Sequence, residues 1–178
     1  MFLFFGVSYL LASVEEWLFH KYMHLKMTNP DSIQKTHMLH HTNTNKTTLE
    51  VSVPFSDDIC FDIRNVNDCL QLLYFSVGNC SLLSFLFPTV SATVVFATTS
   101  SLLAFNVLVW NTYHAYIHGL DAYTICFLKG IPRKYVPIEN IYADWVIQNH
   151  RTHHRFPSGN YNIVFPGADY LFFTYRSS

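Results

Sequence analysis

A run of residues without a single charge, from Leu70 to Trp110, limits what this chain can fold into. The core of a bilayer is about 30 Å thick and is crossed by roughly 20 apolar residues in a helix. The run is long enough for two such helices, residues 70–87 and 89–110, and Pro88 between them predicts the turn of a helical hairpin. The sequence therefore predicts an all-α integral membrane protein.

A third apolar stretch lies at the N-terminus, over residues 2–19. Glu15 and Glu16 interrupt its last turn, and we expect this acidic end to emerge from the lipid. The stretch lacks the basic region and the small-residue cleavage site of a signal peptide, so we interpret it as a membrane helix. About three transmembrane helices are therefore expected.

Composition agrees with a membrane protein of one domain, residues 1–178, in which half the residues are apolar and only 13% are charged. A net charge of −1 and the lack of an aromatic-basic motif argue against a nucleic-acid partner. No two cysteines form a CxxC pair, so we expect free thiols in a reducing environment. The four cysteines are Cys60, Cys69, Cys80 and Cys126.

The basic residues predict the orientation. All eleven Lys and Arg residues lie either between the first stretch and the hairpin or after the hairpin. Three crossings put both regions on one side, and the positive-inside rule makes that side cytoplasmic. For a eukaryotic protein we expect the endoplasmic reticulum. The glycosylation sequon at Asn45 should then stay unmodified.

The histidines are the strongest functional signal, because all ten fall into four short clusters with the order HxxxH, HxxHH, HxxxH, HxxHH. Residues i, i+3 and i+4 share a helix face, so we expect each cluster to point its rings at a common place. Histidines that serve in a core or on a surface would scatter along the chain. Neutral imidazole is a good ligand for iron, zinc, copper or nickel, and ten rings are about right for two ions. The predicted metal ligands are His20, His24, His37, His40, His41, His114, His118, His150, His153 and His154.

The clusters follow the predicted membrane helices along the chain. We therefore expect them to form a histidine-rich helical cap on the cytoplasmic side, which holds a di-metal site. The helix from residue 89 should continue through His118, with Gly119 as its C-cap. Residues 139–154 should form another helix, and residues 25–69 a loop-rich segment with one short helix around the second cluster. A metal transporter would carry histidines inside its spans, whereas the hairpin contains none.

The four clusters in this order, with a hydrophobic hairpin between the second and the third, resemble the integral-membrane fatty acid hydroxylase superfamily. That superfamily also contains sterol desaturases, sphingolipid hydroxylases and carotenoid hydroxylases. Residues 159–175 are similar to the family's closing stretch. The chain departs from the family in having three membrane helices rather than four, and Phe173 where the closing Phe-Gly-Thr has glycine. It also contains no His-Pro-Gly-Gly haem motif, which excludes a fused electron donor of the cytochrome b5 type.

The resemblance implies an oxidoreductase, a membrane-bound di-iron oxygenase that uses dioxygen and external electrons to hydroxylate a lipid. Fatty acyl, sphingoid and sterol substrates all stay open. The cofactors would be two iron ions, with zinc as an inactive substitute because dioxygen activation needs a redox metal. An external donor such as cytochrome b5 or a reductase would supply the electrons. The alternatives are a desaturase on the same site and a catalytically inactive protein with a structural zinc cluster.

Carboxylates near the clusters are candidates for orienting the ligands. Glu16 lies one turn before His20 on the same helix face, so we expect it to accept a free ring N–H. The alternative is that Glu15 and Glu16 only lie in water at the helix end. Asp144 and Asp169 are weaker candidates for the same role.

Overall fold

The computed structural model of the protein describes residues 1–25, 33–52, 59–64 and 66–177, and within these residues it contains helices and no strand. Among them, three helices are long and apolar enough to cross a membrane, which confirms the predicted all-α class and agrees with the predicted number of candidate spans. The elements are α1 (Phe2–Met23), α2 (Ile33–Asn43), α3 (Val66–Leu86), α4 (Ala92–Val109), a π-helical turn η1 (Trp110–His114), α5 (Ala115–Ile117), α6 (Ala122–Ile125), a 3₁₀ turn η2 (Arg133–Tyr135), α7 (Ile141–Arg155) and α8 (Ala168–Leu171).

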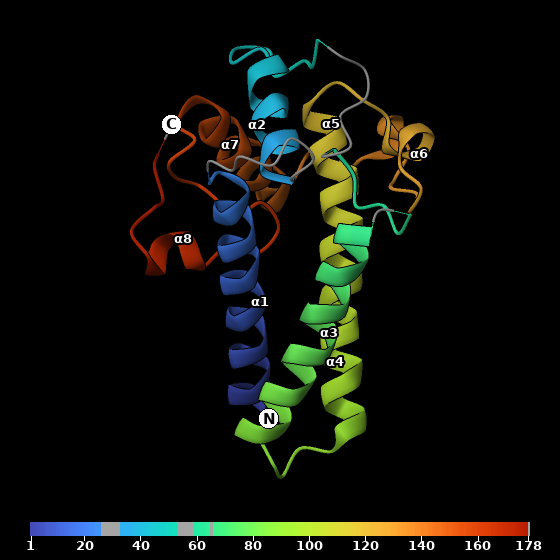
Figure 1. Ribbon diagram of the computed structural model, residues 1–178, viewed down its shortest axis with the longest axis vertical. Helices are drawn as coiled ribbons and strands as arrows, with labels where there is room; N and C mark the ends of the chain where they lie inside the picture. Colours follow the sequence, from blue (N-terminus) through green and yellow to red (C-terminus); the bar gives the residue numbers. More distant parts are fainter. Residues whose placement is uncertain (26–32, 53–58, 65, 178) are drawn as a thin grey trace.

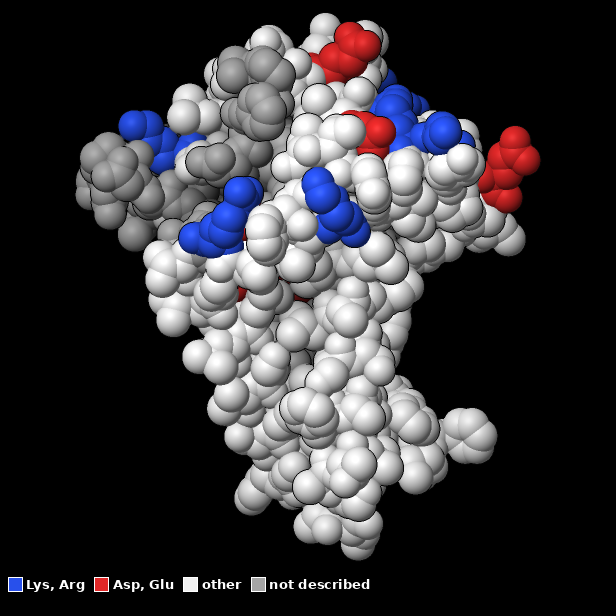
Figure 2. Space-filling view, turned by 90° about the vertical axis from the view of Figure 1, so that its right-hand side faces the viewer, with Lys and Arg blue, Asp and Glu red and all other residues white. Residues whose placement is uncertain are grey.

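The molecule has a narrow stem and a wider cap. Helices α1, α3 and α4 form the stem, and α2, α5, α6 and α7 lie around its upper end (Figure 1). On the face drawn in Figure 2, the charged side chains gather at the cap, while the lower stem carries none among the described residues. The polarity of the surface therefore changes along the long axis, as expected where a stem enters lipid.

The hairpin forms as predicted. Helix α3 ends at Leu86, and the side chain of Ser91 caps α4 by accepting the N–H of Val94 at 3.4 Å. The helix continues through the π-helical turn, so that the third span runs over Ala92–Ile117. Gly119 follows with φ +80°, the left-handed conformation of a helix C-cap.

The C-terminal tail, residues 156–177, is bound to the side of α1. Trp17 donates its indole N–H to the Thr174 hydroxyl at 2.8 Å, and Ser13 donates its hydroxyl to the carbonyl of Phe165 at 2.8 Å. These contacts tie a segment that has almost no helix of its own to the first of the three apolar helices. The tail can thereby reach the top of α1, where the first histidines lie.

Glu16 does not lie in water at the helix end, so that alternative is wrong for this residue. The carboxylate is buried, with 7% of the residue exposed. It accepts backbone N–H groups of the tail from Ile163 at 2.9 Å, Val164 at 2.6 Å and Phe165 at 2.9 Å. A carboxylate inside the protein is tolerated there because several N–H donors replace its water.

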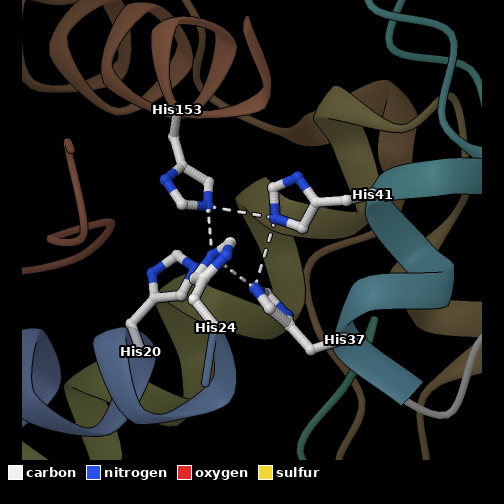
Figure 3. Close-up of side chains that lie close together, drawn as sticks. All are labelled: His20, His24, His37, His41 and His153. Carbon is white, nitrogen blue, oxygen red and sulfur yellow. Dashed lines mark hydrogen bonds between the residues drawn. The ribbon is translucent and has the colours of Figure 1, made fainter. Parts of the chain in front are cut away.

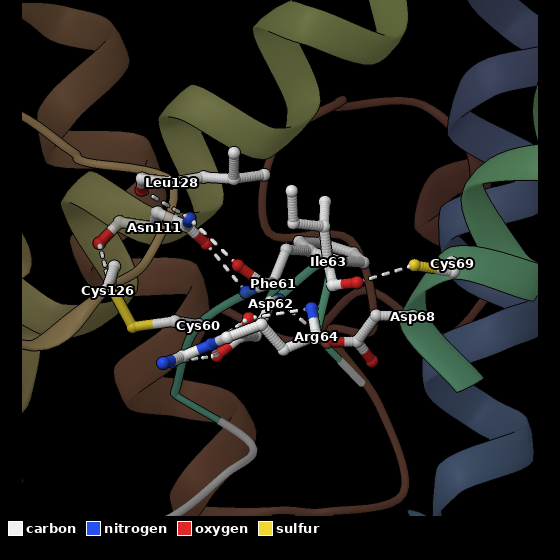
Figure 4. A network of polar contacts seen from close by, with 10 residues as sticks. All are labelled: Cys60, Phe61, Asp62, Ile63, Arg64, Asp68, Cys69, Asn111, Cys126 and Leu128. Carbon is white, nitrogen blue, oxygen red and sulfur yellow. Dashed lines mark hydrogen bonds and ion pairs between the residues drawn. A yellow bond between two sulfur atoms is a disulfide. The ribbon is translucent and has the colours of Figure 1, made fainter. Parts of the chain in front are cut away.

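The expectation of free thiols is also wrong for two cysteines. Cys60 and Cys126 form a disulfide, whereas Cys69 and Cys80 are free. The bond fastens the segment 59–64 to the end of α6. The side chain of Asn111 reinforces this attachment, since it accepts the N–H of Phe61 at 2.8 Å (Figure 4).

Candidate metal centre

Every predicted ligand belongs to one of two groups of five histidines. Within each group the ligand nitrogens all lie within 4.8 Å of one another, and each group could hold a metal ion. The first group consists of His20, His24, His37, His41 and His153. The second group consists of His40, His114, His118, His150 and His154. The two groups are neighbours, because the rings of His41 and His154 stack with their centroids 4.3 Å apart.

The HxxHH clusters do not point at a common place, contrary to the prediction. In α2, His37 and His41 belong to the first group and His40 to the second. Adjacent helix positions point about 100° apart, so neighbouring histidines cannot face one ion, while residues four apart can. Helix α7 follows the same rule in the opposite sense, since it gives His150 and His154 to the second group and His153 to the first.

In the first group, the Nε2 atoms of four rings form a closed set of short contacts (Figure 3). The separations are 2.9 Å for His24–His37, 3.2 Å for His37–His41, 3.1 Å for His41–His153 and 3.1 Å for His24–His153. The fifth ring, His20, lies with its centroid 4.3 Å from that of His153. These four nitrogens therefore converge on a point between α1, α2 and α7.

In the second group, His150 lies at the centre of the contacts. Its Nε2 is 3.0 Å from the Nε2 atoms of both His118 and His154. His114 Nε2 and both ring nitrogens of His40 are buried, with no hydrogen-bond partner among the residues that the structure describes. Buried polar atoms normally have partners, so these nitrogens are suited to a ligand that the protein chain does not supply.

Backbone carbonyls orient several of the rings. In each case the Nδ1–H donates to a carbonyl oxygen, which leaves Nε2 as the atom with a free lone pair. The pairs are His20 with Tyr161 at 2.7 Å, His118 with Leu49 at 2.7 Å, His153 with Gly159 at 2.8 Å and His114 with Ile59 at 3.0 Å. The carbonyls thus select the tautomer that a metal ion needs.

This arrangement fits metal ions better than it fits hydrogen bonds between rings. Two Nε2 lone pairs that face each other at about 3 Å repel when no proton lies between them. Nitrogens bound about 2.1 Å from one ion lie about 3.0 to 3.4 Å apart. The observed separations of 2.9 to 3.2 Å are close to that range.

Burial also keeps the rings neutral, which is the form that binds metal. Burial, with a smaller contribution from the neighbouring His37, lowers the pKa of His24 to about 3. Burial lowers the pKa of His118 to about 4, against the opposing effect of its bond to the Leu49 carbonyl. Burial lowers the pKa in the same direction for His40, His41, His150, His153 and His154.

The carboxylates act on the backbone rather than on the rings, so the role predicted for Glu16 is wrong. The Nδ1 of His20 contacts the Tyr161 carbonyl, and its Nε2 has no hydrogen-bond partner within the described ranges. Glu16 and Asp169 instead hold the tail that carries this carbonyl. Asp169 accepts the N–H of Tyr161 at 2.9 Å, while Asp144 is exposed on α7. Sequence reasoning missed the carbonyls because every residue carries one.

A cavity of about 300 Å³ leads from the membrane helices to the first group. It lies between α1, α3 and α4, and it is lined toward the cap by His20 and Trp110 and, beyond them, by Thr36 and Phe61. Its other walls combine aromatic and aliphatic side chains with several polar ones. The cavity therefore connects the three apolar helices with one of the two histidine groups that could hold a metal ion.

Comparison with known proteins finds no matching family model, curated protein or solved structure. A function for this chain must therefore be inferred from the geometry of the two histidine groups and the cavity, together with the sequence pattern that builds them.

Proposed function

We propose that the protein is a membrane-bound di-iron oxygenase that hydroxylates a lipid. The observation that carries the proposal is a cavity that begins among the three apolar helices and is lined by His20, a member of the first of two adjacent five-histidine groups. A lipid chain could enter such a cavity from the bilayer and present a carbon atom near His20. The order of the clusters, which resembles the fatty acid hydroxylase superfamily, favours the same chemistry.

The chain's own residues hold the ions and exclude water. All ten histidines are the ligands in this proposal, in the two groups described above. Two iron ions, when bound, would supply the activation of dioxygen, which zinc cannot do because it has no redox chemistry. His24 is the one ligand that is partly exposed, whereas the other nine are buried. The rings, the tail and Trp110 thus keep bulk water away from the carbon that reacts.

The electrons come from outside the chain in this proposal, from a donor such as cytochrome b5 or a reductase. The cap faces the cytoplasm, in the endoplasmic reticulum if the protein is eukaryotic, because the basic residues gather there. Desaturation of a lipid on the same site is the second candidate. An inactive protein with a structural zinc cluster is the third, and the burial of nine ligands favours it, since structural zinc sites are closed.

Lipid analysis and metal analysis together test the proposal. Membranes that contain the wild-type chain should gain lipids that carry one additional oxygen atom, and a loss of two hydrogens would indicate the desaturase instead. Oxygen consumption should require iron. Zinc at full occupancy, with no change in any lipid and no oxygen consumption after iron loading, would establish the structural cluster.

His153 offers the sharpest variant for this test. His153→Ala should abolish product formation and release metal from the first group, while the hairpin keeps the protein in the membrane. Gln148→Ala is the matched control, because Gln148 is exposed on the same helix α7. Full activity of the His153 variant on an identified lipid would contradict the di-metal site at its centre.

A further inference from the structure

The cavity is long rather than round. Toward the cap it continues to Phe61 and Thr36, beyond His20 and Trp110, which also line it and whose ring centroids lie 6.0 Å apart. It is also lined by Ser8 and Thr99, which precede those two residues by several helical turns in α1 and α4. At 1.5 Å per residue, Thr99 lies about 16 Å from the level of Trp110 along the axis of α4. The remote end is therefore deep in the membrane-spanning part of the protein.

Two polar side chains at this depth lack partners for their oxygens. Asn79 and Thr99 are buried, with 9% and 4% of the residue exposed, and Asn79 Oδ1 and Thr99 Oγ1 have no hydrogen-bond partner in the part of the chain that the structure describes. Asn79 donates its amide N–H to Glu15 Oε2 at 2.6 Å, which identifies the other amide atom as the oxygen. Unpaired polar atoms inside a membrane protein are costly, because no lipid can satisfy them.

The two oxygens lie at a similar depth. Asn79 in α3 and Thr99 in α4 are at similar distances from the turn at Pro88, and both side chains line the one cavity. An amide oxygen only accepts a hydrogen bond, whereas a threonine hydroxyl can also donate one. An alcohol has the matching set, since it can donate to Asn79 and accept from Thr99. A hydrocarbon can do neither, and an ammonium group can only donate.

We propose that the cavity binds a lipid alcohol, with its hydroxyl at Asn79 and Thr99 and its apolar body extending toward His20. Phe19, Phe75 and Leu102 line the wall along which that body lies. This inference rests on the proposed function in one respect, the identity of the substrate. The substrate would be a lipid alcohol whose reacting carbon lies on the order of 15 Å from its own hydroxyl group. The binding site itself does not depend on turnover.

Binding can be measured without turnover. The full chain, in lipid nanodiscs and without an electron donor, is mixed with hexadecanol, hexadecane or hexadecylamine, and the bound species are counted by native mass spectrometry. Cholesterol serves as a further probe, which distinguishes a rigid ring alcohol from a linear one. At least one of the two alcohols should bind about tenfold more tightly than hexadecane, the difference expected from one or two hydrogen bonds.

Variants at one position of α4 identify the site. Thr99→Val keeps the shape of the side chain but removes its hydroxyl, and it should reduce the preference for the alcohol to near unity. Thr98→Val is the matched control, because it makes the same change one residue earlier, outside the cavity lining. Asn79→Leu, which removes the acceptor, should act like Thr99→Val.

Each outcome decides the inference. Equal binding of the alcohols and hexadecane would overturn it, as would a preference for hexadecylamine, which would indicate a cation site at Glu15. Equal behaviour of the Thr99 and Thr98 variants would also overturn it. An alcohol preference that depends on Thr99, without any oxygenated lipid in membranes, would contradict the proposed oxygenase but leave this binding site. Oxygenation of lipids without an alcohol preference would contradict only the binding site.

Discussion

At the scale of single residues, several of the histidine rings are oriented by groups that carry no charge. The Nδ1 atoms of His20 and His153 contact the backbone carbonyls of Tyr161 and Gly159 in the C-terminal tail. A side-chain substitution cannot remove a backbone carbonyl. It can displace the carbonyl, however, by removing a contact that holds the backbone in place. Glu16 holds the neighbouring residues of the tail through three backbone N–H groups.

Glu16→Gln should therefore destabilise the protein and weaken metal binding together. The glutamine amide keeps one acceptor oxygen but replaces the other with an NH₂ group, which faces backbone N–H donors. This change should lower the free energy of unfolding by roughly 2 to 4 kcal/mol. Metal affinity should fall about 10- to 100-fold, the range known for groups that orient ligands. Thermal unfolding in detergent and competition with a chelator measure the two effects.

Glu15→Gln is the matched control for this prediction. Glu15 lines the cavity and contacts Asn79, not the tail, and the amide oxygen of a glutamine can still accept from that residue. Metal affinity should stay at the wild-type value. If both variants lost metal equally, the tail would not be the link between Glu16 and the ligands.

At the scale of elements, the tail and α7 form a unit around Gly159. A methyl group at this position would lie against the backbone oxygen of Thr174, closer than van der Waals contact allows. The Asn160 N–H donates to the same oxygen at 3.1 Å. Glycine is therefore needed at position 159, where the beginning of the tail packs against the backbone near its end, at Thr174.

Gly159→Ala should push the backbone at position 159 away from that at Thr174 and displace the Gly159 carbonyl, which contacts His153. Such overpacking typically costs about 1 to 3 kcal/mol, and the metal content of the first group should fall with it. Circular dichroism melts and metal analysis give both values. Gly78→Ala is the control, since a methyl group there meets no atom within 4 Å, and this variant should be at least as stable as wild type.

The elements also show what the sequence could and could not predict. The three spans, the hairpin turn and the C-cap at Gly119 follow from hydropathy and from local turn chemistry, so they were predictable. That all ten histidines gather in groups able to hold metal ions was predictable, because histidine type and spacing are visible in a sequence. Their division into two groups was not, because it depends on how α2 and α7 face each other. The inward turn of Glu16 and the disulfide of Cys60 with Cys126 depend on distant segments in the same way.

At the scale of the whole molecule, two signals disagree about the side on which the cap lies. The basic residues favour the cytoplasm, whereas disulfides persist mainly in oxidising compartments. Asn45 is exposed in the cap, and its side-chain oxygen accepts the N–H groups of Thr47 and Thr48. Glycosylation of Asn45 therefore reports directly on which side of the membrane the cap lies.

Asn45 should remain without glycan in a eukaryotic host, because the strong bias of basic residues should govern insertion. Glycosidase treatment followed by gel electrophoresis measures this. A sequon added near the turn at Pro88, on the opposite side, is the positive control and should be modified. Glycan on Asn45 would reverse the orientation and would explain the disulfide.

Acid should unfold the metal-free protein. Burial holds the pKa of His118 near 4 in the folded state, whereas an unfolded histidine has a pKa of about 6.5. The unfolded state therefore binds more protons below about pH 6.5, and stability falls from there toward pH 4. His118 alone should contribute a loss of about 2 kcal/mol at about pH 5.

Thermal melts of chelated protein between about pH 8 and about pH 5 test this expectation. Protein loaded with metal should resist the change at first and then release its ions as protons compete for the rings. A melting temperature of the metal-free protein that does not change over this interval would mean that the rings can take up protons without loss of the fold.

Helices α2 and α7 each contribute histidines to both groups, and this sharing limits how such a site could change during evolution. Each of these helices serves both groups, so the loss of either one would leave neither group with its five rings. The centre is therefore not modular. It cannot shrink to a simpler site with one ion by discarding one helix, and a change of ligand in either group alters a helix on which the other group also depends.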